Sequence, residues 1–187
     1  MTRRVEFTVL PRFYVFFSFM LLLLPLPWLL AALCAGIVHE LGHYLAIRAF
    51  RIPVYGVSLQ GAGARIRTGE MSRLQEVICS SAGPFFGGLL FLLFPIVPRI
   101  AVCGLLQTAY NLLPFPNFDG GRILRSLLSH FLSENRAKGI QSLICRGFLV
   151  ISGIVLCHFN LLVGLTVLAT FLQSIGKRLT NISGVLN

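Results

Sequence analysis

The chain has 187 residues, of which 56% are hydrophobic and only 12% are charged, whereas about 25% of the residues in a typical soluble domain are charged. The net charge of +10 would suit a nucleic-acid partner, but the basic residues lie at the ends of long apolar blocks, where they set the orientation of membrane helices. Composition and charge therefore argue against a soluble domain and against a nucleic-acid partner, and they predict a polytopic membrane protein.

The apolar residues are gathered in long blocks that contain no Asp, Glu, Lys or Arg. These blocks lie between residues 12 and 39, 76 and 99, 99 and 119, and 146 and 177. A helix needs about 20 apolar residues to cross the hydrocarbon of a bilayer, and the blocks approach or exceed that length. The 5 cysteines form no CxxC pair, so we interpret them as small buried thiols.

The first block predicts two helices, Phe13–Leu24 and Trp28–Phe50, because the prolines of the PLPW sequence between them rarely lie within one straight helix. One kinked helix over 13–50 is the alternative, but it would be far longer than a bilayer requires. Arg3 and Arg4 precede the first span as they would in a signal peptide. No small-residue cleavage site follows, so we expect a retained span.

The segment Pro53–Glu70 begins with alternating β-branched residues and is then rich in glycine. This pattern predicts a short β-hairpin or extended segment. A third span is expected over Leu74–Val97, and a fourth follows Arg99 and runs to about Leu113, where the sequence NLLPFPNFDGGRIL interrupts it.

An amphipathic segment is expected over Arg122–Lys138. The last apolar block, Leu143–Ile175, is long enough for one span or for two short helices that turn near His158–Asn160. The predicted fold class is therefore an all-α polytopic membrane protein with about six transmembrane helices and a short β-hairpin after the second helix. We expect residues 1–187 to form a single membrane-embedded domain without an appended soluble domain.

The basic residues of the first four predicted spans are distributed unevenly. Nearly all of them fall on the side that contains the N-terminus, and the other side holds only Arg99. The populous side is expected to face the cytoplasm. The C-terminal end of the second helix and the loop that carries Asp119 run towards that side.

The HELGH sequence places His39 and His43 four residues apart, so both imidazoles project from one face of a helix, one turn apart. Two imidazoles in this arrangement can bind one zinc ion. Glu40, on the adjoining edge of the face, can activate a water bound to that ion. Gly42 leaves room for a neighbouring helix to approach.

Glu40 and Asp119 are the only acidic residues embedded in membrane-like sequence, where an ionisable residue indicates function. Two histidines need a third protein ligand to leave one coordination site open, and Asp119 lies at the right end of a neighbouring span. The alternative is a buried hydrogen-bonded cluster of His39, Glu40 and His43 that packs helices, with Asp119 capping the helix that follows it.

HELGH, followed across another span by NLLPFPNFDGGRIL, resembles the site-2 protease family of intramembrane zinc metalloproteases. The AGPFFGG sequence resembles the Ala-Gly-Pro motif in the third span of that family, and SLQGAGARI resembles its Gly-containing extended segment after the zinc helix. The resemblance covers residues 13–128. The early helical hairpin and the lack of a PDZ-like insert make the chain most similar to the compact, sporulation-type branch.

The resemblance implies a three-helix catalytic core that holds Zn2+ in a single peptidase domain. His39, His43 and Asp119 would be the zinc ligands, and Glu40 would be the general base.

Asn111 opens the NxxP motif, and in the family it would help to hold the substrate carbonyl or the oxyanion. Asn117 stands where the family usually has proline, so it is a second candidate for this role. The alternative role for Asn111 is a helix C-cap before Pro114.

The resemblance also implies that the substrate is itself a membrane-spanning helix, whose scissile segment must unwind before it can be attacked. An exposed strand edge within Val54–Arg67 could receive the unwound segment by β-augmentation. The candidate substrate-binding residues there are Val57, Leu59, Gly61 and Gly63. A plain turn at the membrane surface is the alternative.

We therefore expect an integral protein of the bacterial cytoplasmic membrane that hydrolyses a peptide bond within or near a transmembrane segment of its substrate. Its partners would be the lipid bilayer, a membrane-protein substrate and a regulatory membrane protein. A catalytically inactive scaffold of the same fold and a metal transporter are the alternatives. The complete set of four site residues argues against the scaffold, and a transporter would repeat its ligands across inverted halves, which the sequence does not do.

Overall fold

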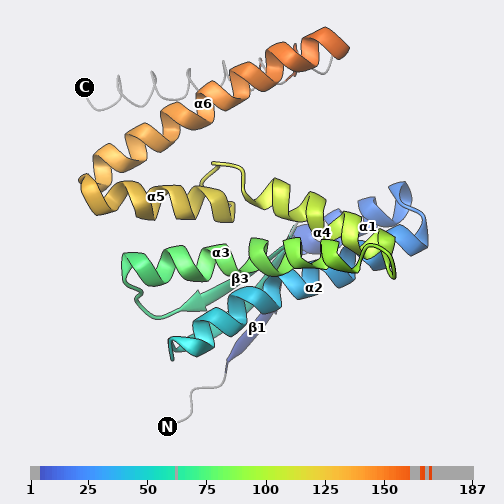
Figure 1. Cartoon of the computed structure of the whole chain (residues 1–187), viewed down its shortest axis with the longest axis horizontal. Coiled ribbons are helices and arrows are strands. Elements are labelled where there is room, and N and C mark those ends of the chain that lie inside the picture. Colours follow the sequence, from blue (N-terminus) through green and yellow to red (C-terminus); the bar gives the residue numbers. More distant parts are fainter. Residues whose placement is uncertain (1–4, 62, 161–164, 167–168, 170–187) are drawn as a thin grey trace. The chain divides into compact units, whose positions relative to one another are not determined.

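The computed structural model describes residues 5–61, 63–160, 165–166 and 169. The chain divides into two compact units, residues 1–133 and 134–187. The first unit consists of β1 (Glu6–Val9), α1 (Pro11–Leu23), α2 (Leu26–Ala49), β2 (Val54–Gln60), β3 (Gly63–Thr68), α3 (Arg73–Leu89), the 3-10 helix η1 (Leu90–Leu93), α4 (Pro98–Asn111) and α5 (Asp119–Phe131) (Figure 1). The second unit contains α6 (Glu134–Phe159).

Helices α2, α3 and α4 contact one another at the centre of the first unit, and α5 packs against α3 (Figure 1). Local sequence signals fix where these helices begin. Pro98 stands in the first turn of α4, where its missing N–H costs no hydrogen bond. At the start of α3, Ser72 Oγ accepts a hydrogen bond from the Gln75 N–H, and Gln75 Oε1 accepts one from the Ser72 N–H.

Glycines allow the three central helices to approach closely. A Cβ atom on Gly42 of α2 would lie 2.7 Å from the carbonyl oxygen of Ala82 in α3. A Cβ atom on Gly104 of α4 would lie 2.7 Å from the carbonyl oxygen of Gly87, also in α3. Larger side chains would push the helices apart. The expectation that Gly42 makes room for a neighbouring helix is confirmed.

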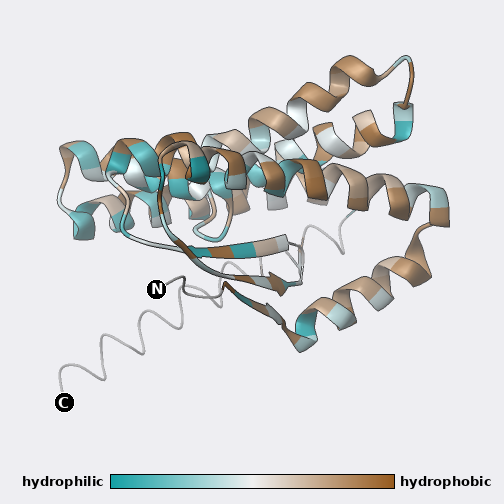
Figure 2. Ribbon diagram, turned by 90° about the horizontal axis from the view of Figure 1, so that it is seen from below, coloured by the Kyte–Doolittle hydropathy of each residue, from teal (hydrophilic) through white to brown (hydrophobic). Residues whose placement is uncertain are grey.

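Among the described residues, three helices are long and apolar enough to cross a membrane: α2, the combined α3 and η1 helix over Arg73–Leu93, and α6. Apolar residues make up much of the helices (Figure 2), and Leu22, Leu92 and Ile96 are 82%, 74% and 77% exposed. Such exposed side chains suit contact with lipid. The larger number of transmembrane helices expected from the sequence, about six, stays a prediction.

Helices α1, α2 and α4 begin and end within two residues of the predicted spans, whereas α3 ends at Leu89 and not at Val97 as predicted. Helices α1 and α4 have 13 and 14 residues, fewer than the roughly 20 that cross a bilayer. The predicted amphipathic segment Arg122–Lys138 belongs to two helices, because Leu132 has an extended backbone between the end of α5 and the start of α6. Most of the last apolar block beyond Asn160 lies outside the described residues.

The predicted hairpin is present as part of a three-stranded sheet of order β1-β2-β3. Strands β2 and β3 are antiparallel and pair from Gln60 and Gly63 at the turn towards Val54 and Thr68. Strand β1 pairs in parallel with β2, with Glu6 opposite Gly56. The sequence analysis did not predict β1. Because β2 lies between the other strands, β3 is an edge strand of this sheet.

The close contact at Gly104 can be tested by substitution. We expect Gly104→Ala to lower the free energy of unfolding by about 1–3 kcal/mol, as overpacking of a tight helix contact does, measured by thermal unfolding in detergent. Gly147→Ala is the matched control, because a Cβ atom on Gly147 in α6 meets nothing within 4 Å. Equal losses in the two variants would contradict this account of the α3–α4 contact.

Candidate metal centre

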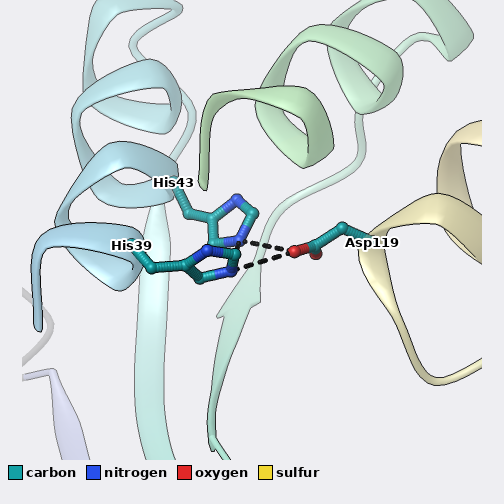
Figure 3. Close-up of side chains that lie close together, drawn as sticks. All are labelled: His39, His43 and Asp119. Carbon is teal, nitrogen blue, oxygen red and sulfur yellow. Dashed lines mark hydrogen bonds and ion pairs between the residues drawn. The ribbon is translucent and has the colours of Figure 1, made fainter. Parts of the chain in front are cut away.

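Two histidines of α2 and one aspartate of α5 point towards one another (Figure 3). His39 Nε2 lies 3.0 Å and His43 Nε2 lies 3.1 Å from Asp119 Oδ2, and the two nitrogens are 3.2 Å apart. All three residues are buried, with exposures of 2%, 8% and 7%. The structure thus brings together the three side chains that the sequence analysis singled out as candidate ligands.

The hydrogen bonding of His43 indicates that lone pairs converge at this point. Its Nδ1 atom lies 2.7 Å from the carbonyl oxygen of Cys79. A carbonyl only accepts, so Nδ1 carries the proton and the neutral ring presents a lone pair at Nε2. That lone pair faces the Asp119 carboxylate, which is repulsive unless a cation or an additional proton lies between them.

The spacing of the three atoms fits a zinc ion. Ligands held about 2.0–2.1 Å from a tetrahedral zinc ion lie about 3.3 Å from one another, and the three separations here are 3.0, 3.1 and 3.2 Å. Two imidazoles and a carboxylate are ligands that zinc commonly takes, and three protein ligands leave the fourth position open. Among the described residues, His39, His43 and Asp119 are the group identified as able to hold a metal ion.

Contacts between α5 and α3 position Asp119, which is the first residue of α5. Ser126 Oγ donates a hydrogen bond of 2.7 Å to Glu76 Oε2 in the first turn of α3. Arg125 Nη2 lies 3.9 Å from Glu76 Oε1. These contacts hold the start of α5 beside the histidines of α2.

Asp119 begins α5, which is not among the described helices long and apolar enough to cross a membrane. Its carboxyl group is ionised at neutral pH. Burial alone would raise its pKa, but the hydrogen bonds and positive charges that His39 and His43 supply when they are protonated outweigh burial and lower the pKa to about 2. Arg122 Nη1 lies 4.0 Å from the second carboxylate oxygen, Oδ1. Asp119 is therefore available as an anionic ligand.

Gly83 of α3 lies directly against both imidazoles. A Cβ atom on this residue would lie 2.2 Å from His43 Nε2 and 2.8 Å from His39 Nε2. Any side chain here would occupy the space next to the candidate ligand atoms. The sequence analysis identified the AGPFFGG motif that contains Gly83, but it did not connect this residue with the histidines.

Glu40 is held by the β-sheet. Its Oε1 atom accepts a hydrogen bond of 3.2 Å from the backbone N–H of Ala64 in β3, and a Cβ atom on Gly63 would lie 3.5 Å from the same oxygen. This bond engages one carboxylate oxygen and leaves Oε2 for another partner. Sequence reasoning missed Ala64, because a backbone donor can belong to any residue except proline.

A cavity of about 840 Å³ joins these groups. Its lining includes His39, Glu40, His43, Gly61, Gly63, Gln107, Asn111, Asn117 and Asp119. The cavity thus contains every residue that the sequence analysis assigned to metal binding or catalysis. A polar cavity can admit water to these side chains.

The remaining candidate residues occupy different places. Asn111 Nδ2 donates a hydrogen bond of 3.0 Å to the carbonyl oxygen of Gln107 within α4, so part of its amide is engaged by its own helix. Of the candidate substrate-binding residues, Gly61 and Gly63 line the cavity. Val57 and Leu59 belong to the central strand β2, which is paired on both sides.

No protein-family model matches the chain. The chain is 26% identical over 107 residues to a zinc metalloprotease of Methanocaldococcus jannaschii. This alignment covers 50% of the chain and 32% of the relative. The chain is 31% identical over 136 residues to a Synechocystis protein that carries the name zinc metalloprotease provisionally, covering 61% of this chain and 36% of the relative. The chain thus spans about a third of the length of these curated relatives.

A site-2 protease from Methanocaldococcus jannaschii has a similar solved structure. The TM-score is 0.65 at 18% sequence identity, and the match covers 91% of this chain and 89% of that one. The two chains therefore share a fold over almost their whole lengths.

The role of Gly83 can be tested through metal content. We expect Gly83→Ala to reduce the zinc that copurifies with the protein to a small fraction of that in the unmodified protein, because the added methyl group displaces His39 and His43. Zinc is measured by atomic emission on protein purified in detergent. Gly88→Ala is the control on the same helix, since its Cβ atom would make only ordinary contacts of 3.9 Å or more. Full zinc occupancy in Gly83→Ala would contradict the proposed location of the ion.

Proposed function

We propose that the chain is a member of the site-2 protease family and a zinc metalloendopeptidase that acts on membrane proteins. The peptide bond that it hydrolyses would lie within or near a transmembrane segment of the substrate. The observation that carries this proposal is the convergence of His39, His43 and Asp119 beside Glu40 in one cavity. An inactive scaffold would have no need of this arrangement.

Each site residue has a role in the proposed hydrolysis. A zinc ion held by His39, His43 and Asp119 would supply Lewis-acid polarisation of water and of the scissile carbonyl. Glu40 would accept a proton from the attacking water and later deliver it to the amine that leaves as the C–N bond breaks.

The Ala64 N–H supports this role of Glu40, because it fixes Oε1 and leaves Oε2 to receive the proton. Asn111 and Asn117, both in the cavity lining, are the proposed donors to the developing oxyanion.

The edge of β3 is the proposed docking site for the unwound substrate. In the β2–β3 hairpin, residues alternate between those that bond the partner strand and those that point outwards. The N–H of Ala64 points outwards to Glu40, so the N–H and C=O of Ile66, two residues further on, point to the same open edge. A substrate strand added there would run past Glu40.

We also propose that the protein lies in the bacterial cytoplasmic membrane, with its N-terminus and active site near the cytoplasmic face. The cavity supports this orientation, because its lining includes Arg12, Arg65, Arg122 and Arg125, and arginines near membrane helices favour the cytoplasmic side. The lipid bilayer, a membrane-protein substrate and a regulatory membrane protein are the proposed partners.

Replacement of the proposed general base separates peptidase chemistry from metal binding. We expect Glu40→Gln to retain zinc and to cleave a model transmembrane substrate at least about a hundredfold more slowly, since a positioned general base typically contributes 10²–10⁴-fold. Glu70→Gln, which alters an exposed acid, serves as the control and should cleave normally. A Glu40→Gln protein that still cleaves at the original rate would contradict the assignment. Bound zinc without cleavage by the unmodified protein would favour the transporter or the scaffold.

The open edge of β3 is tested by removing one backbone donor. We expect Ile66→Pro to slow cleavage roughly tenfold relative to Ile66→Ala, because both variants lose the isoleucine side chain but only proline loses the outward N–H. Zinc content is measured in parallel and should be the same in both. If the two variants cleave equally well, β-augmentation at this edge is wrong.

A further inference from the structure

Gln107 places a primary amide within α4, whose sequence from Pro98 to Thr108 is otherwise apolar apart from Arg99 and Thr108 itself. The Oε1 atom of this amide is buried and has no hydrogen-bond partner within the described part of the chain. A buried acceptor without a partner is costly, typically by about 1–3 kcal/mol in a folded protein. A polar group retained under that cost in a membrane protein calls for a functional explanation.

The position of the Gln107 amide relates it to the metal centre. A Cβ atom on Gly36 of α2 would lie 3.4 Å from Gln107 Nε2 and 3.9 Å from Oε1, so the amide lies against the helix at Gly36. Glu40 follows Gly36 by four residues, or about 6 Å along the helix axis. Gln107 and Glu40 also line the same cavity. The amide is therefore one helical turn from the proposed general base.

Asn111 and Gln107 differ in which part of the amide is engaged. The Asn111 amide donates to the backbone carbonyl of Gln107, which accounts for one of its two N–H groups within α4. The Gln107 Oε1 atom has no such partner among the described residues. The Gln107 amide therefore carries a buried acceptor that the described residues around it leave unsatisfied, whereas the contact of Asn111 within α4 engages one of its donors.

We infer that Gln107 binds the backbone of the substrate segment that enters the cavity, an inference that rests on the proposed function. A primary amide carries a donor and an acceptor side by side, as a peptide unit does. It can therefore accept from a backbone N–H at Oε1 and donate to a backbone C=O at Nε2, whatever the side chains of the substrate are. An unwound segment has such groups to satisfy once its own helical hydrogen bonds are broken, and β3 can pair with only one edge of that segment.

The test measures binding, so it does not depend on turnover. Single-span peptides of about 25 residues, built from Leu and Ala with a Gly-Ser segment near one end, are titrated into the zinc-loaded Glu40→Gln protein in detergent. In each peptide of a series, one backbone amide of the Gly-Ser segment is replaced by an ester, which removes a single N–H. The same series is titrated into the Glu40→Gln, Gln107→Leu double variant.

We expect Gln107→Leu to weaken binding of the all-amide peptide about 3- to 10-fold, the usual effect of one hydrogen bond. We also expect one ester position to weaken binding by a similar factor when Gln107 is present and to have no effect in the double variant. Thr108→Val is the control on α4, because Thr108 Oγ1 donates to the Pro84 carbonyl and does not line the cavity. This variant should unfold at a lower temperature and leave the ester pattern unchanged.

The inference is overturned if every ester has the same effect with and without Gln107, if Gln107→Leu binds the all-amide peptide unchanged, or if no peptide binds at all. Cleavage by protein with Glu40 and Gln107 intact is measured separately. If the protein cleaves the substrate but no ester effect depends on Gln107, only the role of Gln107 is contradicted. If one ester effect depends on Gln107 but the protein does not cleave, the proposed peptidase activity is contradicted and Gln107 still binds peptide backbone.

Discussion

Two imidazole nitrogens and one carboxylate oxygen, each within 3.2 Å of the others, face one another among tightly packed helices. Positive charge between the three atoms would stabilise this arrangement, because His43 uses its ring proton on the Cys79 carbonyl and its Nε2 lone pair faces the Asp119 carboxylate. A metal ion satisfies all three groups at once. It also explains why such polar residues are retained in a chain of which 56% of the residues are hydrophobic.

The surrounding fold keeps the three candidate ligands close together and leaves the space beside them open. Gly83 removes the side chain that would fill the space beside both histidines, and the contacts of α5 with Glu76 hold Asp119 in place. The sheet positions the proposed general base, because the backbone N–H of Ala64 in β3 donates a hydrogen bond to one carboxylate oxygen of Glu40. The edge strand and the general base are thereby joined by one hydrogen bond, so a strand docked on β3 would be aligned with the chemistry.

The amino-acid sequence predicted the centre of the site better than its surroundings. Helical periodicity was sufficient to pair His39 with His43, and the scarcity of intramembrane acids, together with the family motifs, indicated Asp119 across 80 residues of chain. The end of α3 and the division between α5 and α6 were less predictable, because hydropathy shows where a chain is apolar and not where its backbone leaves the helix. Strand β1, the Ala64–Glu40 bond and the orientation of Gln107 depend on tertiary contacts between distant segments, and no local pattern encodes them.

The most direct test of this account is the X-ray absorption spectrum at the zinc edge of the purified, zinc-loaded protein. The account predicts only nitrogen and oxygen ligands at about 2.0–2.1 Å, with the multiple scattering of two imidazoles. Sulfur at about 2.3 Å would show that one of the five free cysteines binds the ion. That result, or a spectrum with no imidazole contribution, would contradict a centre formed by His39, His43 and Asp119.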